Sequence, residues 1–290
     1  MPELPEVETT VRDLKKKVLS RTFIDVWTDF KKLIKRPKDF KIFKEEVKGK
    51  RIINIERRAK NILIRLSGGK TLLIHQKMTG HLLAGKWKFD SGRWKTVLKG
   101  PMEDSVNSFI HLIFFLNGGL MLALSDLRKF AKVELWDDKE LLQNENFRKL
   151  GPEPLNKTFT FLKFKGITTG KRGKIKKVLM DQNIISGIGN IYSDEILWKA
   201  RVNPLRDVSG LKEKELKNIF SSIKVVLKKE IALKGDSMSD YRLINGEKGG
   251  YQKVQKVYRR EGKECSVCGG IIKRIKVNGR SAHFCPNCQK

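Results

Sequence analysis

The sequence predicts an α+β protein of several parts: an N-terminal β-sandwich or barrel flanked by a helix, a helical domain, and a short C-terminal β-hairpin that carries cysteines. Three observations support this prediction. Short apolar runs dominate residues 22–136, apolar residues at helical spacing dominate the chain from about residue 155 to 233, and all four cysteines lie beyond residue 264.

The N-terminal part is predicted to be one helix followed by strands. Pro5 suits the first turn of a helix, and Val7, Val11 and Leu14 then recur at helical spacing. Asn117-Gly118-Gly119 lies between two apolar runs and indicates a hairpin. The predicted strands are Arg51–Arg57, Ile62–Leu66, Thr71–His75, Phe109–Leu116, Leu120–Leu124 and Lys132–Trp136.

The middle of the chain contains a domain boundary. Gly151-Pro152-Glu153-Pro154 interrupts both patterns, as turn residues do between domains. Residues 234–256 include several glycines and lack periodicity, which predicts a mobile loop. We therefore expect an N-terminal domain over 1–136, a linker over 137–156, a helical domain with this loop over 157–256, and a finger over 257–290.

The charge of the chain points to a polyanionic partner. There are 62 Lys and Arg against 32 Asp and Glu, a net charge of +30, and hydrophobic residues make up 39%, enough for a folded core. Nucleic acid is the first candidate, an anionic membrane surface the second, and a merely solvated basic surface the third. No apolar run reaches the roughly 18 residues of a membrane span, and the N-terminus does not resemble a signal peptide, so we expect a cytoplasmic protein.

The four cysteines predict a metal site. Cys265 and Cys268 form one close pair, and Cys285 and Cys288 form the other. Such spacing suits tetrahedral zinc, and four protein ligands leave no open position, so the zinc would be structural. Two disulfides, or a site that has lost its metal, are the alternatives.

The N-terminus offers an unusual nucleophile. If Met1 is removed, Pro2 becomes a secondary amine, which can attack a sugar carbon and form an iminium. Glu3 would then lie close enough to transfer a proton. The same residues also suit an ordinary helix start, where acidic groups favour the helix dipole.

Two other regions are candidates for contacts with a polyanion. Gly187-Ile188-Gly189-Asn190 leads into a helix, where free N–H groups and an Asn190 cap could hold a phosphate, or it is a plain turn. Met78 follows one strand, and Arg128 and Phe130 follow another. Apolar side chains beside basic ones can wedge into a distorted duplex, although Met78 and Phe130 would also suit a core.

In this order, these segments resemble the formamidopyrimidine-DNA glycosylase family, bacterial enzymes that remove 8-oxoguanine and ring-opened purines from DNA. The resemblance extends from Met1 to Lys290. It rests on Pro2–Thr9, Arg57–Lys60, Leu150–Leu155, Gly187–Tyr192, and the terminal cysteines with Arg280. The implied fold is a β-sandwich flanked by a helix, a helix-two-turn-helix domain and a zinc finger.

The resemblance implies a bifunctional glycosylase and AP lyase that acts on damaged double-stranded DNA as a monomer, with one structural zinc, in the cytoplasm on the nucleoid. Pro2 would be the Schiff-base nucleophile, Glu3 the proton-transfer group and Glu6 their support. Lys60 belongs to the catalytic group and, with Asn190 and Arg280, would hold phosphates. The further implied contacts with DNA are His75 and Tyr258 at the phosphates, and Met78, Arg128 and Phe130 in the gap left by the flipped nucleotide, over which a loop near 237–241 would close.

The chain departs from the family pattern at several positions. Leu127, Lys129 and Ala131 replace the usual Pro, Arg and Gly, and Asp236 adds a charge before the loop that would close. A basic stretch, Gly85–Gly100, has no assigned role. The alternatives are a glycosylase resembling endonuclease VIII, which prefers oxidised pyrimidines, and a non-catalytic zinc-finger protein that binds DNA.

Overall fold

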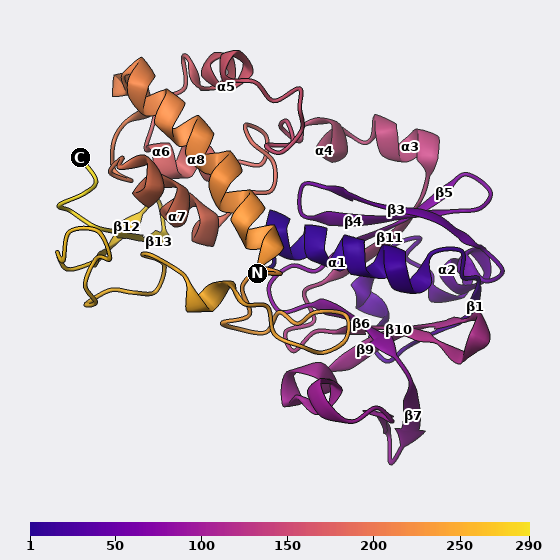
Figure 1. Cartoon of the computed structure of the whole chain (residues 1–290). Helices are drawn as coiled ribbons and strands as arrows, with labels where there is room; N and C mark the ends of the chain where they lie inside the picture. Colours follow the sequence, from indigo (N-terminus) through magenta and orange to yellow (C-terminus); the bar gives the residue numbers. More distant parts are fainter. The chain divides into compact units, whose positions relative to one another are not determined.

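The computed structural model describes residues 1–290 and divides into two compact units (Figure 1). Unit 1 comprises residues 1–148 and 233–252, and unit 2 comprises residues 149–232 and 253–290. No helix is both long and apolar enough to span a membrane.

Unit 1 is built on two sheets. The four-stranded sheet has the order β1-β9-β10-β6 and is antiparallel throughout. The five-stranded sheet has the order β2-β11-β5-β4-β3, in which only the β2–β11 pair is parallel. The strands of the first sheet are β1 (Phe23–Thr28), β9 (Ile110–Leu116), β10 (Met121–Ser125) and β6 (His81–Gly85); those of the second are β2 (Ile34–Arg36), β11 (Lys132–Asp137), β5 (Lys70–His75), β4 (Asn61–Leu66) and β3 (Ile52–Arg58).

One apolar core joins the two sheets and the first helix, α1 (Leu4–Val18). Val7, Val11 and Leu14 of α1 are buried in the same cluster as Leu112 of one sheet and Ile64 of the other. Helix α2 (Phe40–Val47) adds Phe43 and Val47 to this core. Since each strand alternates its side chains between two faces, the inward faces of both sheets meet α1 and the sandwich closes.

The stretch from Gly85 to Gly100 covers the outer face of the four-stranded sheet. It forms the hairpin β7 (Trp87–Asp90) and β8 (Arg93–Thr96). Trp94 packs against Trp27, Phe89 and Phe115, and so gives that face a second apolar layer. Two short 3-10 helices follow, η2 (Gly100–Glu103) and η3 (Ser105–Ser108).

Two other segments belong to unit 1. The expected linker, 137–156, contains α3 (Asp138–Gln143) and α4 (Glu145–Arg148), and the border between the units falls inside it, directly after Arg148. Residues 233–252, which we expected with the helical domain, fold with unit 1. Further short 3-10 helices are η1 (Lys31–Leu33) and η4 (Asn117–Gly119), the latter forming the predicted turn between β9 and β10.

Unit 2 is helical and ends in a β-hairpin. Its helices are α5 (Phe161–Thr168), α6 (Ile175–Met180), α7 (Asn190–Ala200) and α8 (Glu213–Ala232), with 3-10 turns η5 (Val208–Gly210) and, at its border with unit 1, η6 (Tyr251–Lys253). The hairpin consists of β12 (Lys273–Val277) and β13 (Arg280–Phe284), which pair across Asn278-Gly279. Both turn residues have positive φ, as a tight hairpin of this kind requires.

The predicted strands and the first helix are confirmed, each to within one or two residues. The prediction lacked β1, β2, β6, β7, β8 and α2. The expectation that Asn190 caps α7 is wrong: Gly189 is the N-cap, Asn190 is the first helical residue, and no side chain caps this end.

Candidate active site and nucleic-acid interface

The N-terminus is held by the carboxylate of Glu6. Pro2, Glu3 and Glu6 are all buried at the start of α1. The Oε2 atom of Glu6 accepts the backbone N–H of Glu3 at 2.8 Å, which fixes the residue that follows Pro2. Pro5 in the first turn lacks an N–H that would need a partner there, so this helix start is compatible with a buried position.

Lys60 lies in the turn between β3 and β4, and Arg57 ties that turn to α1. The guanidinium of Arg57 donates to Glu8 of α1 at 3.0 Å and to the carbonyl of Ala59 at 3.0 Å. Ala59 has positive φ, which turns the chain sharply and leaves Lys60 buried. The predicted lysine therefore lies on a turn braced against the helix that carries Pro2, Glu3 and Glu6.

His75 is a neutral hydrogen-bond donor. Burial, and then the charges of Lys77, Lys132 and Lys60, lower its pKa to about 3. Its Nδ1 accepts the N–H of Lys77 at 3.0 Å, so Nε2 carries the proton of the neutral ring. His75 can offer a phosphate a hydrogen bond but no charge at neutral pH.

The predicted wedge residues lie on two loops that are joined to each other. Thr79 bonds to Asp126 through its hydroxyl, and it accepts the N–H of Arg128 at 3.1 Å. Met78 and Phe130 are 38% and 50% exposed, so the alternative that they are core residues is wrong. The guanidinium of Arg128 lies 4.5 Å from the centre of the Phe130 ring, which keeps both side chains at the surface together.

Unit 2 contains a hollow of about 470 Å³ between the start of α7 and the finger. Its lining includes two predicted residues, Asn190 and Tyr258, together with Arg259 and Arg274. The Oδ1 atom of Asn190 has no hydrogen-bond partner within the protein. Gln182 holds the preceding glycine turn by accepting the N–H of Gly187 at 2.8 Å and donating to the carbonyl of Ile188 at 2.7 Å.

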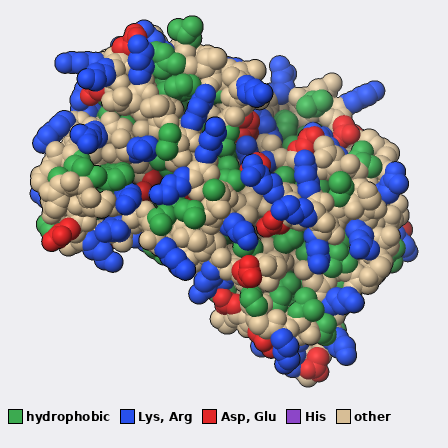
Figure 2. Space-filling view, viewed as in Figure 1, with side chains coloured by type: hydrophobic (Ala, Val, Ile, Leu, Met, Phe, Trp, Pro, Cys, Tyr) green, Lys and Arg blue, Asp and Glu red, His purple; other side chains and the backbone are tan.

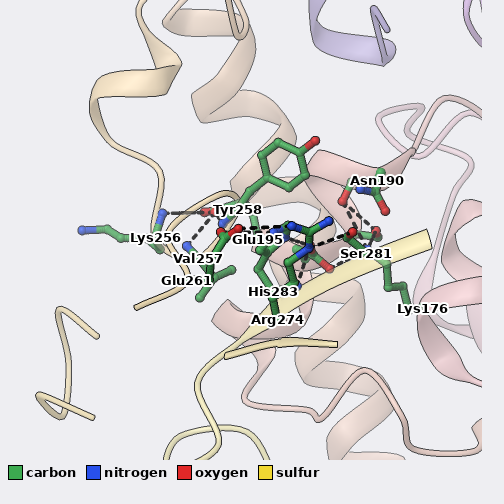
Figure 3. A network of polar contacts seen from close by, with 12 residues as sticks. Lys176, Asn190, Glu195, Lys256, Val257, Tyr258, Glu261, Arg274, Ser281 and His283 are labelled. Atoms are coloured by element: carbon green, nitrogen blue, oxygen red, sulfur yellow. Dashed lines mark hydrogen bonds and ion pairs between the residues drawn. The ribbon is translucent and has the colours of Figure 1, made fainter. Parts of the chain in front are cut away.

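A buried charge network lies beside this hollow (Figure 3). Lys176 of α6 donates to Asp194 of α7 at 2.5 Å, and both side chains are almost fully buried. The other oxygen of Asp194 accepts the backbone N–H of His283 at 2.9 Å and lies 3.0 Å from its Nδ1. Because His283 is in β13, three residues after Arg280, one carboxylate joins two helices to the strand that begins with Arg280.

Tyr258 is positioned by the neighbouring acid. Glu195 accepts the N–H groups of Lys256, Val257 and Tyr258 at 2.9–3.1 Å, which fixes the start of the finger on α7 (Figure 3). The Tyr258 ring packs edge-on against His283 at 5.1 Å. Asp194 and Glu195 together therefore determine where Asn190, Tyr258 and β13 lie within unit 2.

The four cysteines have the geometry of a zinc site. Their Sγ atoms all lie within 4.8 Å of one another, and the Cys268–Cys285 and Cys265–Cys288 distances are 3.4 and 3.8 Å. These distances are too long for disulfides and close to the sulfur–sulfur spacing of about 3.8 Å expected around tetrahedral zinc. Zinc bound there would have four protein ligands and a purely structural role.

The surface is strongly basic. Figure 2 shows Lys and Arg side chains spread across the face in view, as the net charge of +30 leads one to expect. Such a field attracts polyanions and raises their rate of capture.

Three family models match consecutive parts of the chain. The N-terminal domain of formamidopyrimidine-DNA glycosylase matches residues 1–133, its H2TH domain residues 150–242, and the zinc finger found in FPG and IleRS residues 262–290. Formamidopyrimidine-DNA glycosylases of Heliobacterium modesticaldum and Pelotomaculum thermopropionicum are each 37% identical over 290 residues, which is the full length of this chain and 100% and 99% of theirs. This chain belongs to the formamidopyrimidine-DNA glycosylase family.

Solved structures of formamidopyrimidine-DNA glycosylases agree with this fold. A Lactococcus lactis FPG mutant in complex with DNA containing Fapy-dG has a TM-score of 0.87 and 32% identity, and MutM in complex with DNA containing carbocyclic 8-oxo-G has 0.86 and 32%. The wild-type Lactococcus lactis enzyme with DNA containing an oxidised pyrimidine has 0.85 and 32%. Each comparison covers the whole of both chains. The predicted family, the fold and the single structural zinc are confirmed.

Several residues that build the site were not predicted. Asp194 and Glu195 could have been recognised, because two acids interrupt an otherwise apolar helix directly after the glycine turn. Lys176 lies in a run of lysines, where nothing local distinguishes the buried one. Among the departures from the family pattern, Ala131 is buried and donates its N–H to Asp126 at 2.7 Å, whereas Leu127 is exposed.

We predict that Asp194→Asn lowers the free energy of unfolding of unit 2 by about 3–5 kcal/mol, the usual cost of leaving a buried charge without its partner. Lys176 would lose its carboxylate while it stays buried. Urea denaturation followed by circular dichroism measures the effect. Glu213→Gln makes the same charge change at an exposed pair in unit 2 and should leave the urea midpoint unchanged. Equal midpoints for both variants would contradict the prediction.

We predict that His75 destabilises the fold in acid. Its pKa is about 3 in the folded protein and near 6.5 when unfolded, so the unfolded chain binds a proton that the folded one excludes. The titration of His75 therefore costs no stability well above pH 6.5. As the pH drops from there toward 3, it lowers the free energy of unfolding by up to about 1.4 kcal/mol per pH unit. In urea titrations, His75→Gln should make this slope shallower between pH 6 and 4 and run parallel to wild type between pH 7 and 8. The same acid slope in both proteins would refute this account.

Proposed function

We propose that this chain is a bifunctional DNA glycosylase and AP lyase that excises oxidised purines, 8-oxoguanine and formamidopyrimidines, from duplex DNA. Membership of the formamidopyrimidine-DNA glycosylase family supports this activity, and relatives of similar fold are known in complex with DNA that carries Fapy-dG and 8-oxo-G. The observation that carries the proposal is the burial of Pro2 beside Glu3, whose backbone N–H donates to the carboxylate of Glu6 at 2.8 Å.

The reaction begins at Pro2 once Met1 has been removed. The proline nitrogen attacks the sugar carbon that bears the damaged base, the new C–N bond replaces the glycosidic bond, and the base leaves with a proton. Glu3, next to the amine, transfers protons during attack and ring opening. The resulting iminium makes the neighbouring sugar protons acidic, so β- and then δ-elimination release the phosphates on the two sides and the strand is cut.

The other predicted residues hold and distort the DNA. A base inside the stack cannot react, so the nucleotide must be flipped out at a cost of a few kcal/mol. Exposed Met78, Arg128 and Phe130 fill the gap and offset the lost stacking. Lys60, Asn190 and Arg280 hold phosphates, with Tyr258 and the neutral His75 as additional contacts.

Two alternatives are distinguished by chemistry. A relative has been solved with an oxidised pyrimidine in its DNA, so preference for pyrimidines is the nearer alternative and requires comparison of rates on both lesions. A non-catalytic zinc-finger protein would bind damaged DNA without forming a covalent bond. We further propose that the protein acts as a monomer in the cytoplasm on the nucleoid. We keep the domain limits given by the sequence except for residues 233–252, which fold with unit 1.

We predict covalent trapping through Pro2. With borohydride and a duplex that contains 8-oxoguanine opposite cytosine, the reduced iminium should link the protein to DNA, and mass analysis should place the adduct on Pro2 with Met1 missing. Excision of 8-oxoguanine should be faster than excision of thymine glycol. Pro5→Ala, a change in the same turn that leaves the terminal amine in place, should still be trapped. Failure to trap after proven Met1 removal would refute the proposed nucleophile.

We predict that Arg280→Ala weakens binding to lesion DNA by about 1–3 kcal/mol, as expected for the loss of a charged hydrogen bond. The slope of log Kd against log salt concentration should also decrease by about 1, as expected for the loss of one phosphate contact. Lys273→Ala removes the same charge from the paired strand and should have a smaller effect. If Kd and the salt slope stay unaltered in Arg280→Ala, Arg280 holds no phosphate.

A further inference from the structure

Residues 233–252 form a loop that is fastened to the sandwich of unit 1. Its base is closed by the N–H of Gly250, which donates to the carbonyl of Leu233 at 2.8 Å. Further along the loop, the N–H of Ala84 on edge strand β6 donates to the carbonyl of Ile244 at 2.8 Å, and Ile244 is part of the main core. We call residues 233–252 the strap.

The strap and the N-terminus meet at one carboxylate. Glu6 accepts the N–H of Glu3 on Oε2 and the N–H of Asp236 on Oε1, both at 2.8 Å. The same carboxylate therefore bonds to the residue next to Pro2 and to the first part of the strap. A displacement of the strap at Asp236 changes the position of Glu6 and, through it, of Glu3 and Pro2.

The strap is in close contact with Glu6 at two further points. Gly235 has a φ of +77°, and a Cβ atom there would lie 2.7 Å from Oε1 and 2.9 Å from Cγ of Glu6, so a larger residue would be strained and would displace the Glu6 side chain. Tyr241 donates its hydroxyl to the backbone carbonyl of Glu6 at 3.1 Å. Burial and the nearby charge of Glu6 raise the pKa of Tyr241, which keeps this hydroxyl a donor.

The strap is anchored at its far side by an ion pair. The guanidinium of Arg242 bonds to Oδ2 of Asp104 through Nε and Nη2, both at 2.9 Å. Its Nη1 donates to the carbonyls of Ser239 at 2.8 Å and Tyr241 at 2.9 Å. One side chain thus joins Asp104 to the turn that carries Tyr241.

Asp104 is itself fixed on the sandwich. It lies between η2 and η3, and its Oδ1 accepts the N–H of Val106 at 3.1 Å. The amide nitrogen of Asn107 donates to the carbonyl of Pro101 at 2.9 Å, and its Oδ1 accepts from Nε2 of the buried His81 at 2.9 Å. Burial raises the pKa of Asp104, but the hydrogen bonds from Val106 and Arg242 lower it by more. The net shift of this pKa is downward, so the carboxylate stays charged.

The ion pair between Arg242 and Asp104 is largely buried, so its loss would disturb the structure around it. The side chains of Arg242 and Asp104 are 5% and 25% exposed. Without the carboxylate, a buried guanidinium keeps only carbonyl partners, and a charge in that state either draws in water or moves. Either response shifts residues 239–242, which include the hydroxyl that contacts Glu6.

We propose that Asp104 and Arg242 are positioning residues for the Schiff-base reaction: their ion pair holds the strap against Glu6, and Glu6 in turn sets the position of Pro2 and Glu3. This inference rests on the proposed role of Pro2. Asp104 lies in the stretch after the β7–β8 hairpin, so that part of the chain would act on the reaction through the strap and Glu6.

The test compares two neighbouring carboxylates. Asp104→Asn keeps the size and the acceptor for Val106 but loses the ion pair, whereas Glu103→Gln removes an exposed charge that does not contact Arg242. Each protein is mixed in excess with a duplex that contains a preformed abasic site, and the rate of borohydride trapping is measured together with Kd. Asp104→Asn should be trapped about tenfold or more slowly at unchanged Kd, because small misplacement of a nucleophile slows attack steeply. Glu103→Gln should match wild type, and Asp104→Glu should recover most of the rate.

A double-mutant cycle identifies the route. Tyr241→Phe removes only the hydroxyl that contacts Glu6, so Asp104→Asn should slow trapping less in that background than in wild type. If Asp104→Asn does not fold, Arg242→Gln breaks the same ion pair and can replace it in the trapping assay and in the cycle. Wild type that is not trapped would refute the role of Pro2, and with it the basis of the inference. If wild type is trapped, three results would overturn the positioning role alone. Asp104→Asn could be trapped at the wild-type rate, it could differ from wild type only in Kd, or its effect on the trapping rate could simply add to that of Tyr241→Phe.

Discussion

The buried carboxylate of Glu6 is the interaction on which the candidate site in unit 1 depends. A carboxylate removed from water must be satisfied by donors, and Glu6 finds them in the N–H groups of Glu3 and Asp236. One donor comes from the N-terminus and the other from a segment that follows α8. This one acid therefore joins residues 233–252 to the helix that carries Pro2, and Gly235 leaves the space in which its side chain lies.

Unit 2 relies on buried acids in the same way. Asp194 and Glu195 are adjacent on α7 and bind different partners. Asp194 accepts hydrogen bonds from Lys176 and His283, and Glu195 accepts the backbone N–H groups of residues 256–258. The zinc finger buries only a small apolar cluster, which Trp198 of α7 joins, so charge and hydrogen bonds add to its attachment to the helices. The sandwich, in contrast, is held by an extensive apolar core shared by two sheets and α1.

Strands with a clear pattern could be predicted, and the others could not, for physical reasons. β4 and β5 are apolar runs bounded by glycines and polar turns, which local sequence reveals. β1 is interrupted by an irregularity between Phe23 and Asp25, so its alternation is lost, and β2 has only three residues. Their assignment depends on pairing with β9 and β11, more than 80 residues away. The zinc ligands and the N-terminal Pro2-Glu3 were found because their chemistry is local.

The sequence by itself determined what neighbouring residues can settle: the cysteine pairs, the glycine turn before α7, the hairpin turns, the excess of positive charge and the family. Only the tertiary structure decided which lysine in a basic run is buried against Asp194, that His75 is neutral, and that Arg242 finds Asp104. The reason is the same in each case. Burial and pairing are properties of the environment, and that environment is made by residues far away in the chain.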